Sequence, residues 1–489
     1  MRRLWMIFLL RQSTALRYSI RQSPSFRRGR LPLPVRSSVH MMKHASSDAS
    51  SEMWAPTGAP GSLERLCSVS LRACQLMNPL ILSIYHQLEC ESDSNAGVVQ
   101  KLKQDNSAFT IADGLVQRLL VEILYSQISF RDIVGEEEDE CHHVNEDTPK
   151  GTLADDESWF TVQGLTIPTD LRPSVESTKA TIGALAATHF LHSSETDDGI
   201  HKCLGYQHLT VFIDPIDGTR EFSTGKGEQC SVCIGFADEN GKAVAGVIYR
   251  PLSQPKPTWV AGAKAERFAA CDFGRDKVIH SFDDRSAAQV HTNIDENKKR
   301  GSLLTTNGSI SPFVESLIEE LQTERVKSGG AGNKLMMLLE QSLFGNHDDG
   351  GRALYIQDRG VSRWDTCGAE GVLEAFGGRL MKLTTFLPET MDGENAKQTN
   401  NYRDTYTYLA SQTNLDFIPG VATITKYNCS PSTKDVQGNH KSHDVNEVKP
   451  YSNLCGLVAF GKRWNTPEGI KFIEKAIERA ARIHLPAFD

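Results

Sequence analysis

The sequence predicts an α/β protein with at least two domains. A chain of 489 residues has room for two or three ordinary domains, and its 39% hydrophobic residues can fill a globular core. Short apolar runs of strand-forming residues are followed by segments with helical spacing. Residues 303–304 precede the helical segment 313–321, and residues 454–460 precede the helical segment 467–483. No internal repeat interrupts this alternation of strands and helices.

Residues 1–50 have the composition of a targeting segment. The first forty residues contain nine Arg and neither Asp nor Glu, which is typical of a mitochondrial transit peptide. The apolar run 4–10 is too short to span a bilayer, and a secretory signal is the alternative interpretation. Translation from Met41, Met42 or Met53 would give a cytoplasmic form. We expect no membrane span after this segment.

Charge and cysteine content exclude two classes of protein. Without the nine N-terminal Arg, the rest of the chain has a formal net charge of −17 instead of −8. Binding to nucleic acid depends on Lys and Arg that neutralise phosphates, so we expect no nucleic-acid partner. The eleven cysteines at irregular spacing do not match a secreted disulfide framework, which indicates a reduced compartment.

Two amphipathic helices are expected before residue 130. Apolar residues at helical spacing over 63–77 predict the first helix, which Pro79 would bend or end. The second helix begins near Thr110. Asp113, three residues later, forms a capping-box pair with Thr110, so capping is the local explanation of this carboxylate.

An acidic run follows the second helix. A short strand pattern ends at Gly135 and is followed by residues 136–140, which are Glu or Asp throughout. On its own such a run is more often solvated surface than a binding site. Residues 141–205 then form a long segment with mixed helix signals, which we interpret as an insertion.

The rest of the chain is arranged around residues 211–219, Val-Phe-Ile-Asp-Pro-Ile-Asp-Gly-Thr. The three apolar residues predict a buried strand that the proline and glycine end. Asp214 and Asp217 can converge there on one small volume, and their mutual repulsion favours a bound hard cation. Gly218 lets backbone N–H groups approach an anion, and the Thr219 hydroxyl can orient a water. The alternative is an Asp-rich turn without a ligand.

The second half contains a hairpin, a glycine-rich turn and further helices. Residues 231–249 predict a β-hairpin with an Asn-Gly turn. The glycine-rich residues 326–334 open a helix and can present Lys334 to an anion, although such a turn alone is more often a tight connection. Asp365 begins another helix and would by default be its N-cap. Residues 392–450 are polar and predict a surface insertion.

Five carboxylates thus lie at the ends of apolar elements: Asp113, Glu136, Asp214, Asp217 and Asp365. Each has a local explanation, but five together indicate a common cause. Ligation by oxygen alone suits Mg²⁺, which binds through a few carboxylates and substrate phosphates. Two or more Mg²⁺ ions can activate a water and stabilise the leaving alkoxide of a phosphate ester.

Four short stretches also occur together in a known family. They are Thr110-Ile-Ala-Asp113, Gly135-Glu136-Glu137, Asp214-Pro-Ile-Asp-Gly-Thr219 and Trp364-Asp365. With them the chain resembles the inositol monophosphatase superfamily of lithium-sensitive, Mg²⁺-dependent phosphatases. Within it the chain is most similar to the 3′(2′),5′-bisphosphate nucleotidases, through residues 214–222, 329–334 and 364–367. A sister group, the inositol polyphosphate 1-phosphatases, shares Thr110-Ile-Ala-Asp113 followed by Leu115-Val116-Gln117.

The resemblance implies roles for individual residues. Thr219 would relay the proton of the attacking water to Asp113. Two to three Mg²⁺ ions would be held by Glu136, Glu137, Asp214, the Ile216 carbonyl, Asp217 and Asp365. The substrate would be contacted by Gly218, Thr219, Asn307, Gly330 and Lys334. Asn307 and Ile310 stand where nucleotidases usually carry Thr and His, which leaves the preferred substrate open.

The resemblance also implies a fold and an activity. The fold would be an α-β-α-β-α sandwich with domains at 60–265 and 266–489, and with a further insertion near 345–358. The activity would be removal of the 3′-phosphate of adenosine 3′,5′-bisphosphate. Action on 3′-phosphoadenylyl sulfate and inositol 1,4-bisphosphate is also expected, as is inhibition by Li⁺. The alternatives are an inositol polyphosphate 1-phosphatase and a catalytically inactive, metal-binding regulatory relative.

Overall fold

A computed structural model describes most of the chain beyond residue 53. The described residues are 54–90, 100–102, 108–137, 156–190, 204–274, 301–345, 353–358, 361–387, 406–409, 452–453 and 455–486. Residues 52–489 form one compact unit. The predicted targeting segment lies outside the described residues, so its role stays a prediction.

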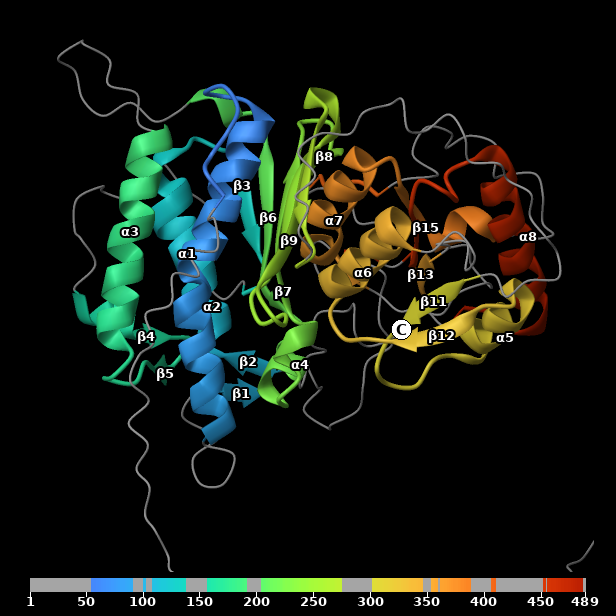
Figure 1. The fold of residues 1–489 in the computed structure, drawn as a ribbon, viewed down its shortest axis with the longest axis horizontal. Helices are drawn as coiled ribbons and strands as arrows, with labels where there is room; N and C mark the ends of the chain where they lie inside the picture. The colour runs from blue at the N-terminus through green and yellow to red at the C-terminus, as the bar shows by residue number, and fades with distance from the viewer. Residues whose placement is uncertain are drawn as a thin grey trace, which may run out of the picture. The chain divides into compact units, whose positions relative to one another are not determined.

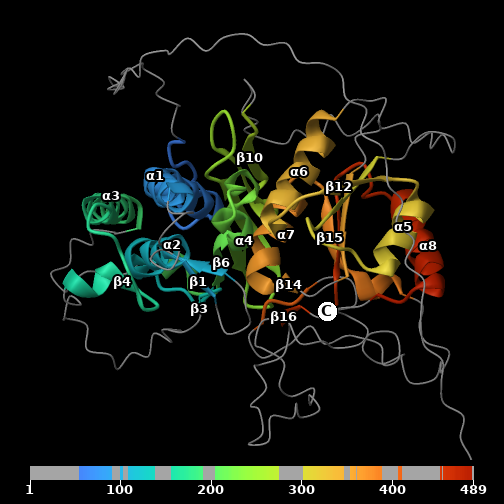
Figure 2. The ribbon, with the colours of Figure 1, turned by 90° about the horizontal axis from the view of Figure 1, so that it is seen from below.

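The unit is built of alternating layers of helices and sheets (Figure 1). Helices α1 (Leu63–Cys90) and α2 (Ile111–Arg118) pack on the first sheet, and α3 (Arg172–Phe190) packs on α1 from outside (Figure 2). Between the two sheets lie α6 (Ala331–Phe344) and α7 (Arg363–Ala375). The outer face of the second sheet is covered by α5 (Pro312–Leu321) and α8 (Pro467–Ile483). The predicted α-β-α-β-α class is confirmed.

The first sheet has six strands in the order β10-β9-β8-β7-β6-β3. Only the edge pair β3 and β6 is parallel, and the other neighbours are antiparallel. Every residue of β6, β7 and β9 is buried, because helices cover both faces of the sheet. The strands are β3 (Asp132–Gly135), β6 (Thr210–Asp217), β7 (Ser231–Ala237), β8 (Ala243–Arg250), β9 (Thr258–Ala263) and β10 (Phe268–Asp272).

The second sheet has five strands in the order β12-β11-β13-β17-β15. They are β11 (Ser302–Thr305), β12 (Glu324–Lys327), β13 (Ala353–Gln357), β15 (Arg379–Lys382) and β17 (Leu457–Phe460). Strand β13 is the middle strand, so this part of the predicted insertion 345–358 is not a loop. All strands of this sheet follow residue 301, whereas the first sheet is complete by residue 272. The domain boundary near residue 265 stays a prediction.

Short elements complete the unit. Three two-stranded pairs are β1 (Gln100–Leu102) with β2 (Ala108–Thr110), β4 (Thr161–Val162) with β5 (Leu165–Thr166), and β14 (Val361–Ser362) with β16 (Ser452–Asn453). The short helices are η1 (Leu119–Leu124), η2 (Tyr125–Gln127), η4 (Asp156–Phe160), η5 (Leu204–Tyr206), α4 (Thr219–Ser223), η6 (Gly227–Gln229), η7 (Lys264–Glu266) and η9 (Leu383–Phe386).

Helix α1 continues through Pro79, so of the two alternatives, a bend or an end of the helix, the end is excluded and the bend stays a prediction. An internal proline costs a helix about 3 kcal/mol. Leu80, Ile81 and Ile84 beyond it are buried, and burial of each such side chain contributes about 1.5–3 kcal/mol, which outweighs the cost. By length and composition residues 63–88 also satisfy the criteria for a membrane span, contrary to expectation, but most of this stretch is buried inside the unit.

The predicted insertions contain ordered structure. Residues 172–190 form α3, whose buried side includes Val175, Ile182 and Phe190. Residues 406–409, which we call the strap, are the described part of the segment predicted as a surface insertion, and Tyr406 and Tyr408 are buried. The backbone N–H of Tyr408 donates to the Gly241 carbonyl at 2.8 Å. The prediction of a surface loop is therefore wrong for the strap, because long-range contacts bury it.

Helix α7 lies against the first sheet at very short distance because glycines face each other. A Cβ atom at Gly246 of β8 would be 2.1 Å from the carbonyl oxygen of Gly368 in α7. A Cβ atom at Gly368 would in turn be 2.6 Å from the carbonyl oxygen of Ile234. Any larger side chain would push the helix off the sheet. This contact fixes the height of α7, which carries Asp365, above the strand that carries Asp214.

Candidate active site

A β-bulge in β6 turns two aspartates toward one place. Asp214 pairs with Cys233 of β7, and Asp217 pairs with Ser231, so three steps along β6 match two steps along β7. In a regular strand, residues three apart point to opposite faces, and one extra residue in a bulge restores the same face. Pro215 lies inside the bulge, where a missing N–H costs no ladder bond. The bulge therefore explains how these two side chains converge.

Asp217 is held by the start of α6. The backbone N–H of Ala331 donates to Oδ1 at 2.7 Å, and that of Gly332 donates to Oδ2 at 2.7 Å. The Ser231 hydroxyl donates to Oδ2 at 2.7 Å as well. The N-terminus of a helix favours a negative charge through its free N–H groups and its dipole. Asp217 thus connects the first sheet to α6, and Ser231 is a residue that the sequence argument missed.

Asp365 approaches from α7. Its Oδ2 accepts a hydrogen bond from the backbone N–H of Ser362 at 2.6 Å, which makes Ser362 the N-cap and Asp365 the third residue of the helix. The expectation that Asp365 is the N-cap is therefore wrong, because the Ser-x-x-Asp capping box places the cap three residues earlier. One carboxylate oxygen from each of Asp214, Asp217 and Asp365 lies within 4.8 Å of the other two.

The electrostatics of this cluster favour a cation. Burial raises the pKa of Asp214 well above its ordinary value, and Glu136, Asp217 and Asp365 raise it further. Burial and Asp217 also raise the pKa of Asp365, to about 7. Oδ1 of Asp214 is buried without a hydrogen-bond partner among the described residues. A bound metal ion would give that oxygen a partner and relieve the repulsion, so the residues present fit a metal site.

Glu136 and Glu137 follow the end of β3. The backbone N–H of Glu136 donates to the Ile213 carbonyl at 3.0 Å, which continues the ladder between β3 and β6 and brings Glu136 beside Asp214. The carboxylate of Glu137 is buried, and Gln163 donates to its Oε2 at 3.2 Å. The acidic run is thus not a solvated surface at these two positions, whereas residues 138–140 lie outside the described residues.

The carboxylate of Asp113 and the hydroxyl of Thr219 form a hydrogen-bonded pair beside the cluster. The Thr219 hydroxyl is 2.9 Å from Oδ1 of Asp113 and 2.9 Å from the carbonyl oxygen of Ile216. Oδ2 of Asp113 accepts the Thr110 backbone N–H at 2.8 Å and the Thr110 hydroxyl at 2.5 Å. The predicted capping role and the predicted contact to Thr219 therefore both exist, and each uses a different oxygen of Asp113.

The predicted substrate contacts line the junction between α4 and α6. Gly218 and Gly330 have φ angles of 88° and 61°, which residues other than glycine rarely adopt. A Cβ at Gly330 would be 2.8 Å from Oδ2 of Asp217. Lys334 is buried with its Nζ 5.2 Å from the centre of the Tyr355 ring. Burial lowers the pKa of Lys334, while the neighbouring Asp217 raises it.

Asn307 is brought to the same junction. Its Nδ2 donates to Oε1 of Glu221 at 3.0 Å and to Oε1 of Gln229 at 2.7 Å. Gln229 also accepts the backbone N–H of Gly329 at 2.7 Å. Glu221 and Gln229 were not predicted as partners of this region, because each forms its hydrogen bonds with residues about 80 to 100 positions away in the sequence. Ile310 packs against the hydrophobic residues between the second sheet and helices α5 and α8, which include Leu303 and Phe313.

Comparisons with known proteins show which sequences this chain is similar to. The family model described as "Inositol monophosphatase family" matches residues 173–412. The 3′(2′),5′-bisphosphate nucleotidase 1 of Mus musculus is 26% identical over 295 residues, which cover 60% of this chain and 76% of the relative. That of Homo sapiens is 28% identical over 195 residues, 37% of this chain and 53% of the relative. The chain thus spans only about half the length of the human relative.

One solved structure matches the chain at low similarity. The extragenic suppressor protein suhB of Bartonella henselae is 12% identical, with a TM-score of 0.41 over 85% of this chain and 98% of that protein. Two of the four stretches that the chain shares with that superfamily, residues 214–219 and 364–365, lie within the family match, and the other two, residues 110–113 and 135–137, precede it. Over residues 173–412, a little under half of its length, the chain is similar to the inositol monophosphatase family.

Proposed function

We propose that the protein is a Mg²⁺-dependent, lithium-sensitive phosphomonoesterase that hydrolyses the 3′-phosphate of adenosine 3′,5′-bisphosphate to give AMP and phosphate. The observation that carries this proposal is the cluster of the buried Asp214 and Asp217 with the half-buried Asp365, next to the Asp113–Thr219 pair. The relatives named as bisphosphate nucleotidases support the substrate class. Hydrolysis of 3′-phosphoadenylyl sulfate and of inositol 1,4-bisphosphate is proposed as a secondary activity.

We propose that the metal is held by the aspartate cluster together with neighbouring oxygen ligands. These are Glu136, Asp214, the Ile216 carbonyl, Asp217 and Asp365, with Glu137 behind them. Such ions polarise a phosphoryl oxygen, lower the pKa of a water and stabilise a leaving alkoxide. They would also supply positive charge that an acidic chain lacks for an anionic substrate. Lithium sensitivity is proposed from displacement of one of these ions.

The protein's own contribution to the reaction is proton transfer. Thr219 Oγ1 takes a proton from the attacking water and passes its own proton to Oδ1 of Asp113. The water oxygen forms a bond to phosphorus while the bond to the ribose 3′-oxygen breaks in line with it. Two Thr110 donors at Oδ2 orient Asp113 for this step.

Substrate binding is proposed at the junction of α4 and α6. Gly218 and Gly330 leave room for an anion next to backbone N–H groups, and Lys334 provides a buried cation there. The Asn307, Glu221 and Gln229 group is the candidate for contact with the rest of the substrate.

Phosphate release from two substrates tests the proposal. The full chain is assayed with adenosine 3′,5′-bisphosphate and with inositol 1,4-bisphosphate, in Mg²⁺, with and without Li⁺. Fast, Li⁺-sensitive turnover of the nucleotide supports the nucleotidase. Preference for the inositol substrate would identify an inositol polyphosphate 1-phosphatase instead. Mg²⁺ binding without turnover of either substrate would refute the enzyme and favour a regulatory relative.

The location in the cell is a separate proposal. The composition of residues 1–50 supports import into mitochondria, with a cytoplasmic form from an internal start. A fluorescent protein fused after residue 53 tests this in a variant with Met41, Met42 and Met53 replaced by Leu, so that translation starts only at Met1; a cytoplasmic signal from that variant would contradict mitochondrial import.

A further inference from the structure

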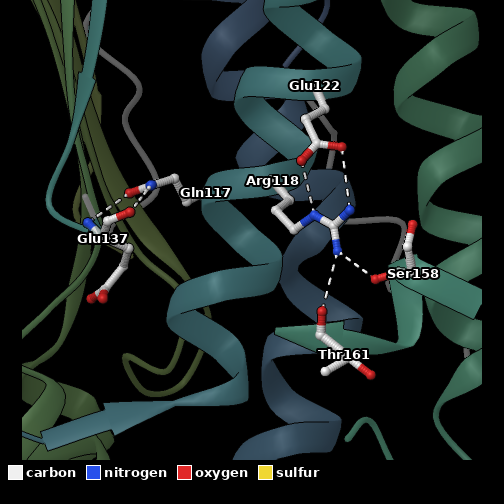
Figure 3. A network of polar contacts seen from close by, with 6 residues as sticks. All are labelled: Gln117, Arg118, Glu122, Glu137, Ser158 and Thr161. Atoms are coloured by element: carbon white, nitrogen blue, oxygen red, sulfur yellow. Dashed lines mark hydrogen bonds and ion pairs between the residues drawn. The ribbon is translucent and has the colours of Figure 1, made fainter. Parts of the chain in front are cut away.

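Gln117 of α2 binds the backbone of the acidic turn, by which we mean Glu136 and Glu137 directly after β3. Its Nε2 donates to the Glu137 carbonyl at 2.9 Å, and its Oε1 accepts the Glu137 backbone N–H at 3.1 Å (Figure 3). A side-chain amide has the same donor and acceptor pair as a peptide group. The last ladder bond of β3 is made by the Glu136 N–H, so the Gln117 amide pairs with the residue directly after the ladder ends.

Gly135 makes room for this amide. A Cβ atom at position 135 would lie 2.3 Å from Oε1 of Gln117 and 2.4 Å from its Cδ. No side chain fits there without displacing the amide. The glycine before the two glutamates and the glutamine on the helix are therefore matched to each other across 18 positions of sequence.

The two contacts leave Glu136 fixed on both sides. Its own N–H is bound to Ile213 of β6, and the next residue is bound by Gln117. We propose that Gln117 is a positioning residue that holds the Glu136–Glu137 turn at the distance from Asp214 that metal binding requires. This inference rests on the proposed metal-dependent function, and it adds a residue that touches neither metal nor substrate.

The neighbouring Arg118 provides a matched control. It lies on the same helix but points the other way, toward the carbonyls of Ser158 and Thr161, at 2.9 Å and 3.4 Å, and toward Glu122 (Figure 3). Its guanidinium also lies 4.4 Å from the centre of the Trp159 ring. Loss of this side chain weakens the packing of α2 without a contact to the acidic turn.

The test compares Gln117→Met with Arg118→Met. The first readout is the Mg²⁺ concentration that gives half of the maximal rise in Tm, which needs no turnover. The second is the Mg²⁺ concentration at half-maximal phosphate release. Loss of an outer partner of a metal ligand typically weakens metal binding about 10- to 100-fold. We expect Gln117→Met to raise both midpoints by that factor with kcat restored at saturating Mg²⁺, and Arg118→Met to lower the metal-free Tm with unchanged midpoints.

Two further variants keep the test decisive if Gln117→Met does not fold. Gln117→Glu keeps the acceptor for the Glu137 N–H and loses the donor to the Glu137 carbonyl. Gly135→Ala keeps Gln117 itself but moves its amide group away from Glu137, because the added Cβ occupies the same space. Both should raise the Mg²⁺ midpoints. Unchanged midpoints in the folded Gln117 variants, or an equal shift in Arg118→Met, would overturn the inference. A wild-type protein that Mg²⁺ does not stabilise would instead refute the proposed function.

Discussion

Replacement of Asp113 by Asn separates the proton acceptor from the metal site. In the wild type, Oδ1 of Asp113 faces the Thr219 hydroxyl and Oδ2 faces two donors of Thr110. The amide of Asn has one oxygen and one NH₂ group. If the oxygen keeps the cap on the Thr110 N–H, the NH₂ group faces Thr219, which can accept from it and still donate to the Ile216 carbonyl at 2.9 Å.

The two consequences of this change differ in size. Exchange of charge-assisted hydrogen bonds for neutral ones at a helix cap costs about 1–2 kcal/mol of unfolding free energy. Thr219 meanwhile loses the group that takes its proton, and loss of a general base lowers the rate about 10²- to 10⁴-fold. Asp113→Asn should therefore fold, bind Mg²⁺ and turn over substrate at least a hundredfold more slowly.

The assay pairs phosphate release from adenosine 3′,5′-bisphosphate with the Mg²⁺-dependent rise in Tm. Thr110→Val is the control, since it removes one donor to Oδ2 but leaves the acceptor toward Thr219 intact. It should lose about 1 kcal/mol of stability and keep its rate within tenfold. An Asp113→Asn variant that keeps more than a tenth of the wild-type rate would show that Asp113 only caps α2.

Three other changes test different parts of the molecule. Burial raises the pKa of Glu370 from 4.5 to about 8. Between these pH values the folded state keeps the Glu370 proton and the unfolded chain loses it, so the free energy of unfolding falls as the pH rises. Urea unfolding of the wild type and of Glu370→Gln at pH 5 and pH 8 measures this. The difference in unfolding free energy between the two pH values should be smaller by a few kcal/mol in the variant, and an equal difference in both proteins would contradict the explanation. Gly368→Ala should push α7 off the sheet, cost about 1–3 kcal/mol and raise the Mg²⁺ midpoint. Gly183→Ala, whose Cβ would meet nothing closer than 3.7 Å, should do neither. Asn307→Ala should raise KM for the nucleotide severalfold with kcat within twofold, and an unchanged KM would exclude Asn307 from the substrate site.

Local patterns made part of the fold predictable. The predicted helix 467–483 coincides with α8, since Thr466 caps it, Pro467 opens it and one apolar face runs along its length. The strap was not predictable, because its burial comes from contacts to residues far away in sequence. Tyr408 donates to Oε2 of Glu370 at 2.6 Å, and Tyr406 donates to the Gly456 carbonyl. A polar composition around four residues says nothing about such partners.

The candidate site shows the same division. The place of Asp214 and Asp217 at a strand end predicted that their side chains would converge. The bulge that brings them together was not predictable, because it depends on how β6 pairs with β7. The cap at Ser362 had a signal, Ser-x-x-Asp, that the sequence argument did not use. Gln117 belongs to a stretch that resembles the inositol polyphosphate 1-phosphatases, but its contact was not predictable, because its partner lies 20 residues away and is backbone. The metal, catalytic and substrate roles of these residues stay predictions.

Assembly of the cluster depends on the packing of α6 and α7 against the first sheet. Asp214 and Asp217 come from that sheet, the N–H groups that bind Asp217 come from α6, and Asp365 comes from α7. No single element contains the three carboxylates, so a chain with α6 or α7 undocked has only part of the site. A ligand that binds only the assembled state stabilises it by mass action. Metal binding should therefore be linked to the docking of both helices. Without the metal the carboxylates of the cluster repel each other, and with the metal bound they should stabilise the docked state.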